Sequence, residues 1–180
     1  MTDETLVSLA RQELPYRTEA FSELVRRYEP RVFRTCKRVL GDEEEARDAA
    51  QEVFLRVFRG LRGFEAKARF RTWLFRIVAN VCSDRLSRRA PEEPYGDDPP
   101  ELPSDPPGTP EHGEVFRAFS LLSPEDRTIL SLRFVSELSL EEIAGSLEIS
   151  LSAAKMRLYR ALERFRERYR ELEAKNPRQV

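Results

Sequence analysis

The sequence has little of what metal sites, disulfides and membrane spans require. Its 180 residues include two cysteines, one histidine and one tryptophan. Since Cys36 and Cys82 form no close pair, we expect no metal site and no cofactor. No apolar run approaches the roughly 20 residues that cross a bilayer, and the N-terminus lacks the basic and apolar regions of an export signal. We therefore expect a cytoplasmic protein with two reduced, buried thiols.

Catalytic signatures are also missing. The sequence contains no phosphate-binding glycine loop, no cluster of metal ligands and no pairing of a nucleophile with a base. The lone His112 lies in a proline-rich segment, which is a poor setting for catalysis. We therefore predict that the protein is not an enzyme.

Charge is abundant but segregated. The net charge is −1, with charged residues making up 35% of the chain. Glu65 and Asp84 are the only acids between Arg56 and Arg89, whereas residues 42–52 are acidic. Such segregation produces local positive fields that a net charge near zero conceals, and these fields favour contact with nucleic acid.

Apolar residues recur at helical spacing through most of the chain. Pro30 lies inside the second of the expected helices and predicts a kink or a break near Glu29. The fold class is therefore all-α. The expected helices are Asp3–Leu14, Ala20–Leu40, Glu43–Leu61, Phe70–Leu86, Glu114–Leu122, Pro124–Val135, Leu140–Leu147 and one from Leu151 to about Ala174.

A change of composition divides the chain in two. Residues 90–113 hold eight of the twelve prolines and seven acids, with no lysine or arginine. This segment predicts a flexible, acidic, proline-rich linker between two small helical bundles, residues 1–89 and 114–174, followed by a short tail, 175–180. Fully extended, the linker would reach roughly 70 Å, or about 20 base pairs of duplex.

Residues 139–162 read as two helices joined by a tight turn. Ser139 with Glu142 has the spacing of a capping box, and Ser150 can cap the second, basic helix. This pattern is typical of a helix-turn-helix that inserts into a DNA major groove. An ordinary helical hairpin with a solvated basic face is the alternative.

The helix predicted at Phe70–Leu86 carries more aromatic residues than one narrow stripe can bury. Two interpretations remain open from the residues alone. Either the helix is buried on two sides of a small bundle, or its aromatic and basic side chains form a surface for unstacked bases, with Trp73 among them.

Four segments together resemble the sigma-70 family of bacterial RNA polymerase sigma factors, most closely its compact extracytoplasmic-function (ECF) group. They are DAAQEVF at 48–54, FRTWLFRI at 70–77 with Asn80, LLSPEDRTILSLR at 121–133, and LEEIA at 140–144. The resemblance spans nearly all of residues 18–172 and implies a dissociable polymerase subunit that directs promoter-specific initiation, with core RNA polymerase and promoter DNA as partners.

The resemblance also implies roles for particular residues. Polymerase binding would fall to Asp48, Gln51, Glu52 and Arg56. Recognition and melting of the −10 element, with a flipped base near residues 65–69, would fall to Lys67, Arg69, Arg71, Trp73, Arg76 and Asn80. Recognition of the −35 element would fall to Ser152, Lys155, Met156, Arg157, Tyr159 and Arg160. An anti-sigma factor is a further expected partner.

Three positions depart from the family pattern. Glu148 stands where glycine is usual, which predicts a left-handed residue at the corner or an altered corner. Ala154 replaces a larger aliphatic residue, and Met156 replaces a small polar residue and would favour a thymine methyl. An autonomous helix-turn-helix regulator is the alternative function.

Overall fold

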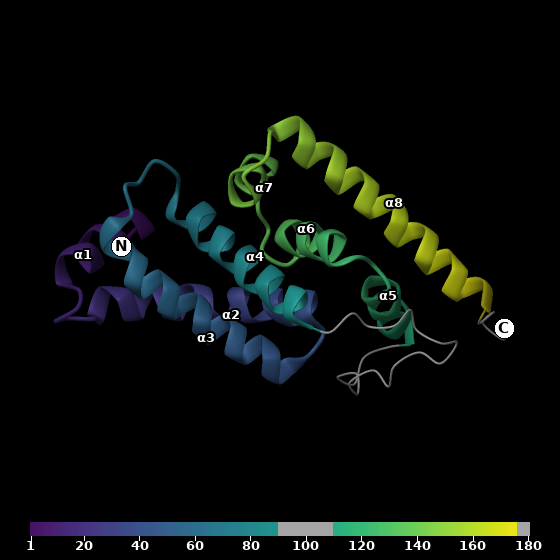
Figure 1. Cartoon of the computed structure of the whole chain (residues 1–180), viewed down its shortest axis with the longest axis horizontal. Helices are drawn as coiled ribbons and strands as arrows, with labels where there is room; N and C mark the ends of the chain where they lie inside the picture. Colours follow the sequence, from purple (N-terminus) through teal and green to yellow (C-terminus); the bar gives the residue numbers. More distant parts are fainter. Residues whose placement is uncertain (90–109, 176–180) are drawn as a thin grey trace.

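A computed structural model describes residues 1–89 and 110–175, which are entirely helical apart from turns and connections (Figure 1). The predicted linker at 90–109 and the end of the tail, 176–180, lie outside the described residues. The α-helices are α1 (Asp3–Glu13), α2 (Glu19–Leu40), α3 (Glu43–Gly60), α4 (Phe70–Arg88), α5 (Pro110–Ser120), α6 (Pro124–Phe134), α7 (Leu140–Leu147) and α8 (Leu151–Lys175), with a 3-10 turn, η1 (Leu61–Gly63).

The first bundle consists of α1 to α4. Helix α2 packs along α3, α4 packs against both, and α1 closes one end. Ala46, Ala49 and Ala50 are buried on α3, so its backbone can approach its neighbours closely. The largest fully buried side chains of this bundle are Leu24, Leu40, Leu61, Leu74 and Phe75. The apolar stripes predicted for these helices therefore form one core.

The second bundle consists of α5 to α8, with the long α8 packed against the other three helices. Its core contains Leu132, Leu138 and Ile143, and α8 contributes the fully buried Ala154 and Ala161. Helix α5 begins at Pro110, so residues 110–113, predicted as the end of the linker, are helical.

The helix caps predicted at Ser139 and Ser150 are confirmed. Ser139 accepts a hydrogen bond from the Glu142 amide at 3.1 Å, and the Glu142 carboxylate accepts one from the Ser139 amide at 2.9 Å. Asp42 and Ser123 also cap helices, α3 and α6, each by accepting one hydrogen bond from a backbone amide of the first turn. Glu148 ends α7 in the left-handed conformation, with φ 54° and ψ 42°, so the corner keeps the usual shape without glycine.

Pro30 does not break α2, which runs without interruption from Glu19 to Leu40. A proline inside a helix removes one backbone hydrogen bond and costs about 3 kcal/mol. Leu24, Tyr28, Val32 and Cys36 are buried on both sides of it, and their burial offsets that cost. Of the predicted kink or break near Glu29, the break is therefore excluded, and the kink stays a prediction.

One ion pair ties α8 to the start of α6. The Arg164 guanidinium donates to both carboxylate oxygens of Asp126, at 2.6 and 2.7 Å, and Asp126 is only 5% exposed. This pairing raises the pKa of Arg164. The second bundle therefore depends on a buried carboxylate that keeps its charge partner.

Arg164→Ala should lower the free energy of unfolding by about 2 kcal/mol, because it leaves the buried Asp126 carboxylate without its partner. Chemical denaturation followed by circular dichroism measures the change. Arg166→Ala, at an exposed position on the same helix, is the matched control. Equal stability of the two variants would contradict the expectation.

Candidate nucleic-acid and protein interfaces

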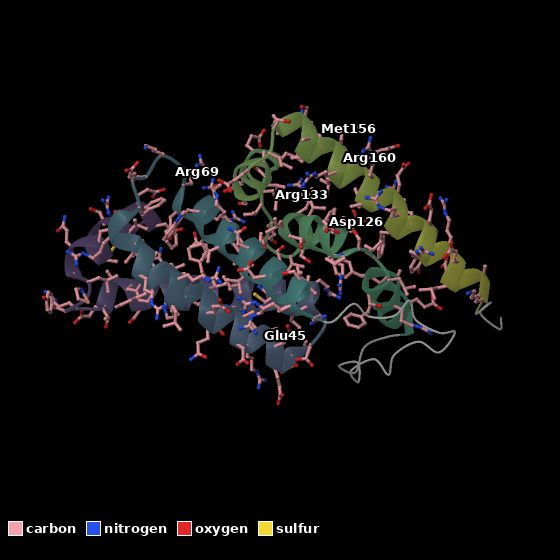
Figure 2. All side chains as sticks on the ribbon, viewed as in Figure 1. Glu45, Arg69, Asp126, Arg133, Met156 and Arg160 are labelled. Carbon is pink, nitrogen blue, oxygen red and sulfur yellow. The ribbon has the colours of Figure 1, made fainter. Side chains whose placement is uncertain are left out.

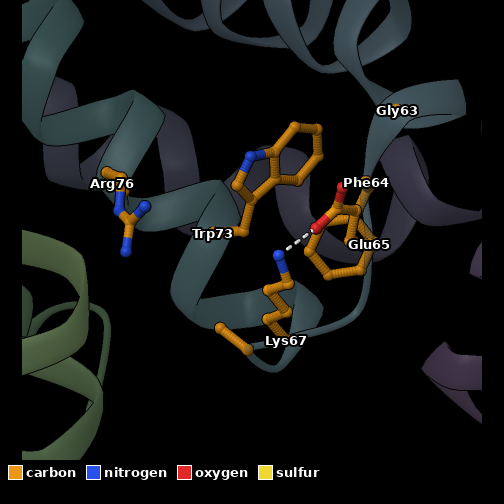
Figure 3. Close-up of a pocket in the computed structure, with 7 residues that line it drawn as sticks. Gly63, Phe64, Glu65, Lys67, Trp73 and Arg76 are labelled. Atoms are coloured by element: carbon orange, nitrogen blue, oxygen red, sulfur yellow. Dashed lines mark ion pairs between the residues drawn. The ribbon is translucent and has the colours of Figure 1, made fainter.

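A pocket of about 370 Å³ opens where α3 ends and α4 begins (Figure 3). Its lining residues are Gly63, Phe64, Glu65, Lys67, Ala68, Trp73 and Arg76. The turn η1 and the loop after it carry the chain around this pocket, and the start of α4 closes the other side. The loop at 65–69 predicted to receive a flipped base therefore does border a pocket.

Trp73 forms one wall of the pocket. Its indole lies against the Phe64 ring, with centroids 4.9 Å apart, and near Phe70 at 6.0 Å. A Cβ added at Gly60 would lie 3.1 Å from the indole, so the ring sits directly on the backbone there. The wall is thus an aromatic surface whose position is fixed by its packing against Phe64 and the backbone at Gly60.

Charged groups stand beside this aromatic wall. Glu65 and Lys67 form an ion pair, which Figure 3 shows next to the Phe64 ring, and Arg76 lines the pocket from α4. A nucleobase has a π face and a polar edge. A flat apolar wall beside side chains of both negative and positive charge can accommodate both of these features.

The six residues predicted for the −10 element do not all gather at the pocket. Lys67, Trp73 and Arg76 line it. Arg69 is exposed at the N-cap of α4 and Asn80 is exposed further along that helix. Arg71 instead donates hydrogen bonds to the carbonyl oxygens of Ser136 and Glu137 in the second bundle.

The core interpretation of the aromatic helix is confirmed for part of its residues, and the base-binding interpretation stays a prediction for Trp73. Phe70, Leu74 and Phe75 are buried in the bundle, as the core interpretation requires. Trp73 is partly buried and lines the pocket, where the base-binding interpretation needs an aromatic side chain.

A second hollow, of about 520 Å³, lies between α2 and α3. Asp48, Ala50 and Gln51 line it together with five aromatic or aliphatic side chains from both helices and Leu55, which is 49% exposed. The full lining is Phe21, Val25, Glu29, Phe33, Arg47, Asp48, Ala50, Gln51, Phe54, Leu55 and Phe58. An apolar floor with polar residues at its edge resembles a protein-binding surface.

The structure separates the four residues predicted for polymerase binding. Asp48 and Gln51 are exposed at the hollow. Glu52 instead accepts hydrogen bonds from Arg56 at 2.6 Å and from Arg85 at 2.9 Å. Partial burial opposes ionisation of Glu52, but these two arginines outweigh it and hold the pKa of that carboxyl below its ordinary value. Glu52 and Arg56 thus tie α3 to α4.

The sequence interpretation missed the hollow itself. Phe54 and Phe58 have the helical spacing of core residues, yet both are only partly buried and line the hollow. Leu55 follows Phe54 and is exposed. Leu55, an apolar residue beside the acidic face of the helix, was the one signal in the sequence that could have indicated a binding surface there.

The predicted −35 residues all lie on the exposed side of α8. Ser152, Lys155, Met156, Arg157, Tyr159 and Arg160 are exposed. Figure 2 shows Met156 and Arg160 on the outer edge of the helix. Because Ala154 and Ala161 face the core, α8 presents one continuous face of polar, basic and apolar side chains near its N-terminus.

Across residues 1–89 and 110–175, no helix combines the length and apolarity needed to span a bilayer. The same segments hold no cluster of three or more potential metal-ligating side chains.

Each of the two bundles overlaps a region that matches a known protein family. Residues 24–92 match the family described as Sigma-70 region 2, and residues 112–165 match the family described as Sigma-70, region 4. The chain is 31% identical over 170 residues to the ECF RNA polymerase sigma factor SigW of Bacillus subtilis, covering 86% of this chain and 91% of SigW. It is 30% identical over 170 residues to the RNA polymerase sigma-H factor of Pseudomonas aeruginosa, covering 80% and 83%.

Solved structures share the fold. CnrH, in complex with the cytosolic domain of CnrY, matches with a TM-score of 0.69 and 23% identity over 97% of this chain and 98% of CnrH. RpoE of Bartonella quintana, in complex with the anti-sigma factor NepR, matches with a TM-score of 0.66 and 19% identity over 83% and 96%.

Proposed function

We propose a separate role for each of three surfaces of this chain. The chain belongs to the sigma-70 family of RNA polymerase sigma factors, in its ECF group. As a sigma factor it binds core RNA polymerase and directs promoter-specific initiation of transcription, and it is not an enzyme. An autonomous helix-turn-helix regulator, the alternative from the sequence, does not account for the match of residues 24–92 to region 2.

The pocket beside Trp73 takes a base of the −10 element that has flipped from the melted non-template strand. Flipping costs a few kcal/mol, and stacking on an aromatic side chain returns about 1–3 kcal/mol. The rigid indole and the Glu65–Lys67 pair support this assignment. Arg69 and Asn80 are exposed on either side of the pocket residues along α4, where they can contact the same strand.

The hollow between α2 and α3 docks core polymerase, specifically the coiled coil of its largest subunit. Asp48 and Gln51 supply polar contacts at the edge, and the apolar floor accepts side chains of the partner helices. Glu52 and Arg56 act by fixing α3 against α4. This assignment is supported by the acidic face, the exposed Leu55 and the volume of the hollow.

The exposed face of α8 reads the −35 element in the major groove. Lys155 and Arg160 can donate to base edges, and Arg157 to phosphate. Met156, which is 50% exposed, cannot form paired hydrogen bonds and contacts a thymine methyl. The protein then works in the cytoplasm, and a protein antagonist of the anti-sigma kind restrains it, as the complexes of CnrH and RpoE with other proteins suggest.

The observation that carries the proposal is the order of surfaces along one chain: a hollow and an aromatic pocket in region 2, then a basic recognition helix in region 4. Transcription in vitro with purified core polymerase and a genomic template library tests it. We expect defined transcripts that require this chain. Identical transcripts from core polymerase alone would contradict the proposed roles of the three surfaces.

Lys155→Ala and Arg160→Ala should each weaken use of the −35 element about tenfold, because a direct contact to a base is worth about 1–3 kcal/mol. Affinity for core polymerase should not change, since neither residue lies near the hollow. Arg170→Ala, exposed near the far end of the same helix, is the control for general charge loss. Loss of core binding in the first two variants would contradict the division of labour.

A further inference from the structure

Four aromatic side chains form a row from the interior of the first bundle to the pocket beside Trp73. The Tyr28 ring on α2 meets the Phe70 ring edge to face, with centroids 5.5 Å apart and an interplanar angle of 69°. The Phe70 centroid lies 6.3 Å from that of Phe64 and 6.0 Å from that of Trp73. Aromatic pairs at such distances favour particular ring orientations. The orientation of the pocket wall is therefore linked to that of Tyr28.

Helix α1 holds the inner end of this row. The Tyr28 phenol donates a hydrogen bond to the carboxylate of Asp3, which lies in the first turn of α1. Tyr28 is only 6% exposed, and a buried hydroxyl group is costly unless it has a hydrogen-bond partner. Hydrogen bonds to a charged acceptor are also stronger than those between neutral groups. Asp3 thus ties the Tyr28 ring to a separate helix.

The Asp3 carboxylate is itself fixed in place. Arg27 donates to its other oxygen at 3.0 Å, and the same guanidinium donates to Glu23 at 2.9 Å. Burial and the adjacent Asp3 carboxylate raise the pKa of Tyr28 above its ordinary value. The phenol therefore stays protonated at neutral pH and remains a donor. Each oxygen of Asp3 thus has one donor from α2.

We propose that Asp3 and Tyr28 are positioning residues for capture of the −10 base: they orient the aromatic wall of the pocket from within the bundle and do not contact DNA. The inference rests on the proposed function of the pocket. Residues 24–92 match Sigma-70 region 2, so Asp3 and the whole of α1 lie outside that match. The proposal therefore gives a specific role to a helix that the family match does not cover.

Helix α1 also packs on the turn that borders the pocket. It contacts η1 as well as α2 and α4. Leu61 in η1 is fully buried, and Gly63 and Phe64, which follow it, line the pocket. Close packing transmits a displacement of one element to its neighbours. Helix α1 thus supports the wall in two ways, through Tyr28 to Phe70 and through η1 to Phe64.

Tyr28 also belongs to the core of the first bundle, so a loss of general stability is the alternative explanation for a defect in its variants. Trp73 separates the two explanations, because it is the only tryptophan among the 180 residues. Its fluorescence therefore reports on the pocket wall alone. A loss of general stability changes the unfolding transition, whereas a loss of positioning changes the surroundings of Trp73 in the folded protein.

Quenching of the Trp73 fluorescence by acrylamide, in the free protein, is the first test. Asp3→Asn keeps the shape of the side chain but removes its charge, and Tyr28→Phe keeps the ring but removes the donor. Either change weakens the hydrogen bond that fixes Tyr28, so we expect acrylamide to quench Trp73 more strongly than in the unmodified protein. Glu4→Gln removes the neighbouring, exposed carboxylate of α1. It is the matched control and should leave the quenching unchanged.

The rate of open-complex formation with core polymerase is the second test. Asp3→Asn and Tyr28→Phe should each slow promoter opening about fivefold, the effect of losing one hydrogen bond. Binding of a −35 duplex should not change, because α8 lies in the other bundle. Glu4→Gln should open promoters at the rate of the unmodified protein. Circular dichroism at the assay temperature should show that all three variants are folded.

Combined variants identify the route of the effect. If Tyr28 acts through the indole, adding Tyr28→Phe to Trp73→Ala should slow promoter opening no further. Asp3→Asn together with Tyr28→Phe should likewise slow opening no more than either change alone, because both remove the same hydrogen bond. An additional slowing by Tyr28→Phe in the Trp73→Ala protein would show that Tyr28 acts through general stability, and it would overturn the proposal.

Unchanged quenching in both Asp3→Asn and Tyr28→Phe would also overturn the proposal. So would stronger quenching with normal promoter opening, because base capture would then not depend on how the wall is held. Equal opening rates for the unmodified protein and Trp73→Ala would contradict the proposed function of the pocket. Since quenching is measured without DNA, it distinguishes a failure of the positioning from a failure of that function.

Discussion

Trp73→Ala should slow formation of the open promoter complex by about 30-fold, the effect of losing about 2 kcal/mol of base stacking. The indole is the largest flat surface of the pocket, and it is held in place by Phe64, Phe70 and the backbone at Gly60. A base that leaves the duplex must replace its lost stacking within the protein. Without the indole, that replacement is missing.

The measurement must separate this role from a structural one, since Trp73 also packs against the first bundle. Holoenzyme assembly and the midpoint of thermal unfolding should be recorded with the opening rate. Trp73→Phe, which keeps a smaller aromatic surface, should recover most of the rate. Normal promoter opening by Trp73→Ala would make the indole an ordinary core side chain.

Helix ends could be predicted from the sequence, because the residues that cap a helix are close to one another along the chain. The Ser139 and Glu142 capping box needs only three residues of chain, and the structure contains it. The left-handed conformation at Glu148 was one of two alternatives that the resemblance to the family implied, because glycine is usual at this position. The continuity of α2 through Pro30 did not follow from the sequence, because the proline penalty is local, whereas the burial of Val32 and Cys36 that offsets it depends on the whole bundle.

The arrangement of the bundles could not be predicted in the same way. Arg71 and Ser136 are 65 residues apart, and the segment between them includes the proline-rich stretch. Nothing in the pattern around Arg71 distinguishes a guanidinium that binds a phosphate from one that binds a backbone carbonyl. In the sequence, Gly145 is only a residue of low helix propensity. Its packing against Thr72 becomes evident only in the folded structure.

The hollow between α2 and α3 leads to the second large effect, because Leu55 is an apolar side chain that the fold leaves half exposed. Side chains at the centre of an interface contribute 2 kcal/mol or more in favourable cases. A charge placed there would lose its hydration without gaining a partner. Leu55→Asp should therefore weaken binding of core polymerase by about 100-fold, or roughly 3 kcal/mol.

Competition between the variant and unmodified chain for a limiting amount of core polymerase measures this loss. Leu9→Asp on α1 is the matched control, because Leu9 is also partly exposed, at 36%, and does not line the hollow. Leu55→Asp should unfold at the same temperature as the unmodified chain, since the aspartate remains in water in the free protein. If both variants compete equally well, core polymerase docks elsewhere, and Asp48 and Gln51 lose their proposed role with Leu55. A selective loss would assign the hollow to the polymerase, on a face of the first bundle separate from the α4 surface that the second bundle covers.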